Sequence, residues 1–256
     1  MIATTNPLHD PLHGCQSRAL AKRRRTLRTQ PLLWVVTGSI ATGKSTISEM
    51  LRWLGVPVFD SDQTVHRLLG LGGKAVAKIA AEFPQAVQTD PGGRMAIDRA
   101  ILSRLVFGDL PRLRRLEAIV HPLVGQERER FLRLVGNAQP RRGGTRRLVT
   151  IDSPLFFEVL QNHRAIPLAR QSRTECPTPS LVITASCPDF LQGQRALRRP
   201  TMTPQKLAAI RAQQLPGREK NLRADRSIPS GLNRGYTLRR LKTILAASRQ
   251  PIHPEG

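Results

Sequence analysis

One short segment constrains this chain more than any other. Residues 38–45 read Gly-Ser-Ile-Ala-Thr-Gly-Lys-Ser and match the pattern GxxxxGK[ST] without a gap. An apolar run before it, Leu32–Thr37 (LLWVVT), predicts a buried strand, and the spacing of apolar residues over Ser45–Leu54 predicts a helix. A strand, a glycine-bearing turn and a helix in this order are the setting in which this motif binds phosphates.

The residue types of the motif suit a nucleotide polyphosphate. Backbone N–H groups of the loop curl around the phosphates, and the helix N-terminus adds positive potential. Lys44 is expected to reach the β- and γ-phosphates, and the Ser45 hydroxyl to ligate Mg²⁺. The predicted ATP-binding residues are Gly38, Ser39, Ile40, Ala41, Thr42, Gly43, Lys44, Ser45 and Thr46.

Acidic residues follow two further predicted strands. Asp60 and Asp62 come after the apolar run 56–59, where one carboxylate could take the proton of an attacking hydroxyl. The alternative is that both acids cap the following helix. Asp152 ends the predicted strand 146–151, and an acid at this place behind a phosphate-binding loop is expected to hold the Mg²⁺ shell.

Strands and helices alternate along the remaining chain. Leucine and valine at helical spacing predict helices over 63–83, 98–135, 203–223 and 237–247, and LVITA predicts a strand over 181–185. Residues 162–180 show no period and predict a long loop. Such alternation predicts an α/β fold with a parallel sheet.

The charge of the chain is extreme, with a formal net charge of +23. A basic chain raises the possibility of nucleic-acid binding, but aromatic residues make up only 4% and do not interleave with the basic runs as base-stacking surfaces require. An arginine-rich surface around a polyanionic small substrate fits better. The excess charge is concentrated in residues 1–30 and 162–256, outside the best motifs.

The two ends of the chain and its cysteines give weaker indications. Residues 1–31 are basic and without period, which predicts a flexible extension, with a targeting segment as the alternative. Three scattered cysteines favour a reducing, cytoplasmic setting over a disulfide framework. No apolar run has the roughly 18 residues that a membrane span needs.

Two other features have a functional and a structural reading. Arg195 and either Arg198 or Arg199 would share one helical face. From this face they could clamp a phosphoryl group. The alternative is that they form only a solvated surface. His121 precedes Pro122 in a helical region, where a lone histidine is more often structural.

Six segments in order resemble the dephospho-CoA kinase family. They are TGSIATGKST (37–46), FDSDQTVHRLL (59–69), IVHPL (119–123), IDSPLFFE (151–158), FLQGQRALRRPTMTPQKLAAIRAQQLP (190–216) and RADRSIPSG (223–231). The resemblance covers about residues 32–247. It implies transfer of the γ-phosphate of ATP to the ribose 3′-hydroxyl of dephospho-CoA, the last step of coenzyme A synthesis.

The resemblance also implies an architecture. It is a three-layer α/β/α P-loop fold with a helical acceptor-binding insertion over about 63–135 and a lid over about 190–216, followed by a tail over 248–256. It makes Asp62 the general base, with Lys44, Arg195 and Arg199 around the phosphates.

For the two ligands, the resemblance implies separate contacts. His121, Pro122 and Leu155 would contact dephospho-CoA, and the stretch 225–231 would lie along adenine. It predicts no protein partner and leaves the oligomeric state open.

The chain departs from the family pattern in the longer segment 162–180, in its basic N-terminal extension and at three places within the motifs. Ser39 and Ala41 replace loop glycines, and SIPSG replaces a polar VIDNG-type stretch. These departures leave open a weakly catalytic or regulatory nucleotide-binding member of the family. Another small-molecule P-loop kinase and a nucleic-acid-binding protein are the remaining alternatives.

Overall fold

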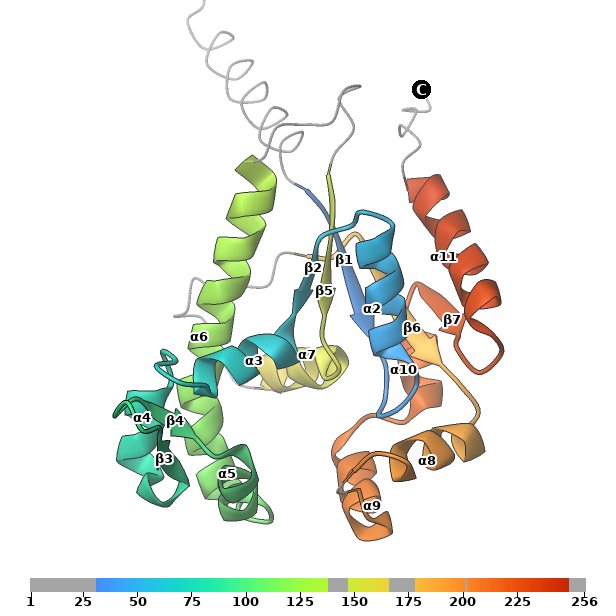
Figure 1. Cartoon of the computed structure of the whole chain (residues 1–256). Coiled ribbons are helices and arrows are strands. Elements are labelled where there is room, and N and C mark those ends of the chain that lie inside the picture. Colours follow the sequence, from blue (N-terminus) through green and yellow to red (C-terminus); the bar gives the residue numbers. More distant parts are fainter. Residues whose placement is uncertain (1–30, 138–146, 166–177, 201, 249–256) are drawn as a thin grey trace, which may run out of the picture.

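A five-stranded parallel sheet forms the centre of the protein. The computed structural model describes residues 31–137, 147–200 except 166–177, and 202–248 (Figure 1). The sheet order is β2 (Val58–Asp60), β5 (Leu148–Asp152), β1 (Leu32–Thr37), β6 (Leu181–Ser186) and β7 (Arg226–Pro229). All four neighbouring pairs are parallel, so the predicted parallel α/β sheet is confirmed.

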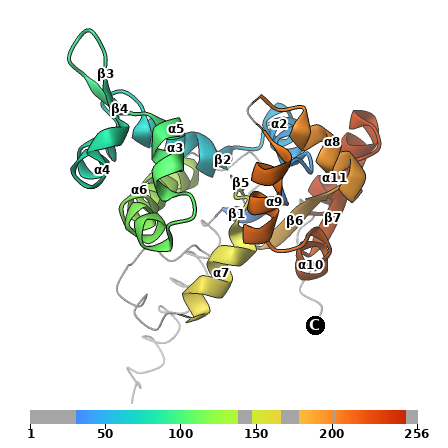
Figure 2. The ribbon, with the colours of Figure 1, turned by 90° about the horizontal axis from the view of Figure 1, so that it is seen from below.

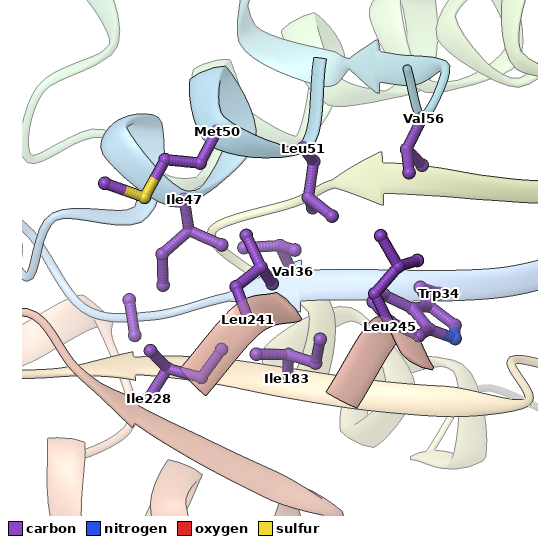
Figure 3. Packing of buried hydrophobic residues seen from close by; sticks show 11 residues of the cluster. Trp34, Val36, Ile47, Met50, Leu51, Val56, Ile183, Ile228, Leu241 and Leu245 are labelled. Carbon is purple, nitrogen blue, oxygen red and sulfur yellow. The ribbon is translucent and has the colours of Figure 1, made fainter. Parts of the chain in front are cut away.

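Alternation along β1 divides its side chains between the two faces of the sheet. Trp34 and Val36 pack against α2 (Lys44–Trp53) and α11 (Arg234–Ser248), which supply Leu51 and Leu241 among others (Figure 3). Because both faces of this strand are covered, its residues are apolar almost throughout, as expected for a central parallel strand.

The second face of the sheet packs against two other helices. Leu33 and Val35 of β1 join Phe156 and Phe157 of α7 (Phe156–Ala165), together with the C-terminal half of α6 (Leu110–Asn137). The three layers place helices on both sides of the sheet, which is the predicted P-loop architecture.

A helical insertion between β2 and β5 has its own apolar core, to which Leu68, Ile79, Leu102 and Val120 contribute. It comprises α3 (Ser61–Leu69), α4 (Val76–Glu82), the 3₁₀ turn η1 (Pro84–Ala86), the hairpin β3 (Val87–Thr89) and β4 (Met95–Ile97), α5 (Arg99–Val106) and the N-terminal half of α6.

Two predicted long helices of the insertion are each broken at glycines, so those predictions were wrong in length. Region 63–83 breaks between α3 and α4, where Gly72 has φ 67° and a Cβ on Gly73 would lie 2.2 Å from the Leu68 carbonyl oxygen. Region 98–135 breaks at Gly108, with φ 79°, and Asp109 then accepts a hydrogen bond from Arg112 N–H at 2.9 Å. The hairpin β3–β4 was not predicted.

A second helical segment follows β6. It contains α8 (Asp189–Leu197) and α9 (Pro204–Gln213), which pack together, and continues to α10 (Gly217–Arg223). The predicted helix 203–223 is therefore two helices, separated at 214–216, where Pro216 caps α10. We call α8 and α9, residues 189–213, the lid segment.

Three further predictions differ from the structure. Strand β7 was not predicted, and the final helix starts at Arg234 rather than 237. Helix α7 extends to Ala165, into the predicted loop 162–180, of which 166–177 lie outside the described residues. The extension 1–30 and the tail 249–256 also lie outside them.

The insertion and the lid segment lie on opposite sides of the carboxyl edge of the sheet (Figures 1 and 2). Within the described residues, no helix combines the length and apolarity needed to cross a bilayer.

Candidate active site

A cleft of about 460 Å³ opens at the carboxyl edge of the sheet, within the range typical of small-molecule sites. The whole of segment 38–46 lines it, together with Asp62, Arg195 and Arg199. The other lining residues are Pro154, Ile210, Gln214, Ser230, Leu232, Arg234 and Thr237.

The loop backbone requires unusual conformations at particular positions. Gly43 has φ 88°, and a Cβ there would lie 2.7 Å from Ser230 Oγ; a Cβ on Gly38 would lie 2.6 Å from Thr42 Oγ1. Glycine is therefore needed at both motif positions.

Ala41 adopts φ 59° and is the only described residue other than glycine with positive φ. The left-handed conformation that a glycine would take freely is thus retained by alanine, at a cost of about 1 kcal/mol. Its methyl group is buried against Ala196 and Leu207 of the lid segment. The departure from glycine therefore adds an apolar contact between the loop and the lid segment.

Lys44 and Asp152 form an ion pair across 108 residues of sequence. Asp152 is only 3% exposed, and its second carboxylate oxygen accepts a hydrogen bond from Ser48 Oγ at 2.6 Å. Because β1 and β5 are neighbours with Val36 opposite Asp152, the strand end brings this acid beside the loop. Lys44 is thereby held at the base of the cleft.

The two acids after β2 have different surroundings. Asp60 Oδ1 accepts a hydrogen bond from Gln63 N–H at 2.9 Å and caps α3, so the capping alternative is correct for Asp60. Asp62 instead lines the cleft with Lys44.

The pKa of Asp62 lies above its ordinary value of 3.8. Partial removal of the carboxylate from water is the largest cause, and the negative charges of Asp152 and Asp60 add to it, whereas Lys44 acts in the opposite direction. Asp62 keeps an exposed surface, so this desolvation is incomplete. A carboxylate with a raised pKa is a better proton acceptor once it is ionised.

The arginines of the lid segment separate into two groups. Arg195 and Arg199 line the cleft, and Arg195 Nη2 donates a hydrogen bond to the Ser230 carbonyl at 3.0 Å. Arg198 is exposed and does not line it. Two cations therefore face the loop.

The predicted acceptor contacts lie apart from this cleft. His121 and Pro122 are exposed in the middle of α6, between Val120 and Leu123, which face the core of the insertion. Leu155 is 42% exposed and follows the cleft residue Pro154. None of the three predicted residues lines the cleft.

Oxygen donors around the loop suit Mg²⁺, which usually keeps several waters and uses one or two protein oxygens together with substrate phosphates. The exposed Ser45 hydroxyl and the Asp62 carboxylate face the cleft, and Asp152 lies behind Lys44. Among the described residues, no group of three or more His, Cys, Asp or Glu side chains could hold a metal by itself. Mg²⁺ bound here would therefore need further oxygen ligands, such as substrate phosphates.

Several cleft residues were not predicted from the sequence. Gln214 Oε1 accepts a hydrogen bond from Ile40 N–H at 2.9 Å, and Ser230 Oγ donates to the Thr42 carbonyl. Arg234 and Thr237 contribute from α11. The family resemblance places Ser230 in the stretch along adenine and Gln214 in the segment 190–216 that it makes the lid, but gives neither residue a role; no signal pointed to Arg234 or Thr237.

Comparison with known proteins gives consistent results. Residues 32–233 match the dephospho-CoA kinase family. A dephospho-CoA kinase of Paramagnetospirillum magneticum is 46% identical over 223 residues, covering 86% of this chain and 93% of the relative. A dephospho-CoA kinase of Rhodospirillum rubrum is 43% identical over 217 residues, covering 85% of this chain and 92% of the relative.

Solved structures share the fold. A crystal structure of a Thermus thermophilus protein is 29% identical with a TM-score of 0.63, covering 85% of this chain and 98% of that chain. The structure of a dephospho-CoA kinase from Campylobacter jejuni has a TM-score of 0.54 at 19% identity, covering 87% of this chain and 100% of that chain. At this identity the similarity supports the fold alone. With the phosphate-binding loop, Asp62 and the lid arginines in one cleft, the chain belongs to the dephospho-CoA kinase family.

Proposed function

We propose that this protein transfers the γ-phosphate of ATP to the ribose 3′-hydroxyl of dephospho-CoA. The observation that carries the proposal is the meeting of Lys44 and Asp62 in one cleft at the phosphate-binding loop. Phosphoryl transfer needs a cation at the transferring group and an acceptor for the hydroxyl proton, and this pair supplies both.

In the proposed reaction, each of a few side chains has a separate role. Asp62 accepts the proton of the acceptor hydroxyl as its oxygen attacks phosphorus in line with the leaving ADP oxygen. Lys44 and, from the lid segment, Arg195 and Arg199 neutralise charge on the transferring phosphoryl group. Bound Mg²⁺, with Ser45 and Asp152 as the proposed protein contributors, would neutralise charge on the phosphates.

The acceptor is expected on the side of Asp62, because α3 leads from this residue directly into the insertion. We propose that the insertion forms most of the dephospho-CoA site, with His121, Pro122 and Leu155 among its contacts. Because these three residues lie outside the cleft, we propose that they contact the distal part of a long substrate rather than its reacting hydroxyl. We propose a cytoplasmic location for the reaction.

Formation of ADP by the purified full chain with ATP and Mg²⁺ tests the proposal. Dephospho-CoA should stimulate ADP formation, and shikimate, gluconate and nucleosides should not. Asp62→Asn should abolish most of this stimulation. Asp60→Asn is the matched control, because asparagine keeps an oxygen for the Gln63 N–H and caps helices equally well.

A different result would separate the alternatives. Turnover with another acceptor would identify a different small-molecule kinase. ATP binding without any acceptor-dependent turnover would contradict the proposal and favour a weakly catalytic family member.

A further inference from the structure

A lysine of α10 is completely buried beside α7 and the end of β5. Lys220 of α10 is 0% exposed; its ammonium group forms an ion pair with Glu158 Oε1 at 2.7 Å and donates a hydrogen bond to the Pro154 carbonyl at 2.9 Å. A buried ammonium is tolerated only when it is paired and hydrogen-bonded. These two contacts supply both conditions.

Glu158 joins this lysine to the end of the lid segment. The same Oε1 atom accepts a hydrogen bond from Leu215 N–H at 2.9 Å, just after α9 ends. The other oxygen, Oε2, is buried and has no hydrogen-bond partner among the described residues. A single oxygen of Glu158, Oε1, therefore contacts both the Lys220 ammonium and the backbone N–H of Leu215.

The two groups held by this pair belong to different segments beside the cleft. Pro154 lines the cleft two residues after Asp152, which is the partner of Lys44. In the segment after α9, Gln214 precedes Leu215, lines the cleft and accepts a hydrogen bond from the loop N–H of Ile40 at 2.9 Å. The Glu158–Lys220 pair thus lies at the junction of the strand end, the lid segment and the phosphate-binding loop.

Energetics favour a positional role over a stabilising one. Replacing a buried ion pair by apolar residues of similar volume is often neutral or stabilising, because desolvation offsets the attraction between the charges. An apolar pair could fill this space, but it could not bind the N–H of Leu215 or the carbonyl of Pro154.

We propose that Glu158 and Lys220 are positioning residues: they fix the C-terminal hinge of the lid segment against the end of β5, so that Gln214 and the lid arginines meet the phosphates of the bound nucleotide. The inference rests on the proposed function for its kinetic readout only. Neither residue lines the cleft, so both act through the segments that they hold.

The double variant Glu158→Met/Lys220→Met tests this role in the full chain. We expect a Tm close to that of the wild type, because relief of the desolvation cost of two buried charges offsets the loss of partners for the Leu215 N–H and the Pro154 carbonyl. We also expect kcat/KM for ATP to fall about tenfold to a hundredfold, as small misplacements of catalytic groups do. Amide hydrogen exchange over 189–215 should become faster, and the Kd of the fluorescent analogue mant-ATP should rise. Glu219→Gln, which removes a charge from the exposed Glu219–Arg223 pair on the same helix, should change none of these.

The single variant Glu158→Gln gives a second test if the double variant does not fold. Glutamine keeps an oxygen for Leu215 N–H but loses the charge that pairs with Lys220, so hydrogen exchange over 189–215 should be faster and kcat/KM lower than in the wild type, with a loss of less than about tenfold. A double variant with wild-type kcat/KM and hydrogen exchange would overturn the proposal, as would a loss of Tm with unchanged exchange at 189–215 in Glu158→Gln. Because mant-ATP affinity and exchange do not require phosphoryl transfer, they test the inference even if the proposed reaction fails.

Discussion

Asp62 illustrates how a single side chain combines function with a cost in stability. Its pKa is raised in the folded protein, chiefly by partial desolvation, so the folded state holds this proton more tightly than the unfolded chain. Stability from this group is present at acidic pH and is lost as pH rises from 3.8 through the folded-state pKa. At neutral pH the ionised carboxylate therefore destabilises the fold.

The variant Asp62→Asn is accordingly expected to have opposite effects on activity and stability. Turnover should fall about a hundredfold or more, since a general base contributes 10²–10⁴-fold. The Tm should rise at pH 7.5, and the gain should disappear as the pH is lowered toward 3.8. Differential scanning fluorimetry across this pH range measures the effect. A lower Tm at pH 7.5 would show that Asp62 stabilises the loop instead.

The wild-type pH profile provides a related check. kcat/KM should rise with pH through the elevated pKa of Asp62, because only the ionised carboxylate accepts the proton. The variant Asp60→Asn should show the same rise of kcat/KM with pH.

Ala41 presents a balance of small opposing terms. The variant Ala41→Gly relieves about 1 kcal/mol of left-handed backbone strain, but it removes a buried methyl worth about 0.8 kcal/mol and adds unfolded-state entropy. Urea denaturation should show a change of less than about 1 kcal/mol in the free energy of unfolding. Ala41→Val should destabilise far more, since a β-branched residue tolerates positive φ poorly. Equal effects of the two variants would contradict the strain argument.

At the scale of elements, the lid segment places its arginines unequally. Arg195 is tied to the Ser230 carbonyl, whereas Arg199, beyond the end of α8, is exposed and faces the cleft. An exposed cation next to the loop can move toward the phosphates with little loss of existing contacts.

Substitution of two adjacent arginines separates specific action from general charge. Arg199→Ala should lower kcat about tenfold to a hundredfold, because it removes a donor at the charge that develops in transfer. Arg198→Ala, with the same loss of charge one residue away, should leave kcat within about twofold. Equal losses in steady-state assays would mean that only the net charge of the lid segment matters.

At the scale of the whole molecule, the described site is contained within residues 38–237, with the insertion and the lid segment on either side of it (Figure 2). Every described cleft residue comes from this range.

Removal of residues 2–30 should leave kcat and KM within about twofold of the full chain, since the described phosphate-binding loop, Asp62 and the lid arginines are all retained. Steady-state kinetics on the two proteins measure this. A large rise in the KM for either substrate would indicate that the basic extension takes part in binding the anionic ligands.

Local sequence determined the parts of this protein that short-range physics controls. Strand β1 was predicted from its apolar run, and the loop from the spacing of Gly38, Gly43 and Lys44, because these depend on neighbours in the chain. Asp62 and Asp152 were recognisable because acids that follow parallel strands collect at one edge of the sheet. The family resemblance added the lid arginines, which helical spacing alone left undecided.

Tertiary structure alone decided the remainder. The adjacency of β1 and β5 pairs Lys44 with Asp152, and the return of α9 brings Gln214 to Ile40; no local pattern encodes contacts between such distant segments. The broken helices depend on glycine turns that let α3, α4, α5 and α6 enclose one core. Likewise, a buried Lys220 is invisible in sequence, because lysine is usually solvated and only the three-dimensional meeting with Glu158 makes its burial possible.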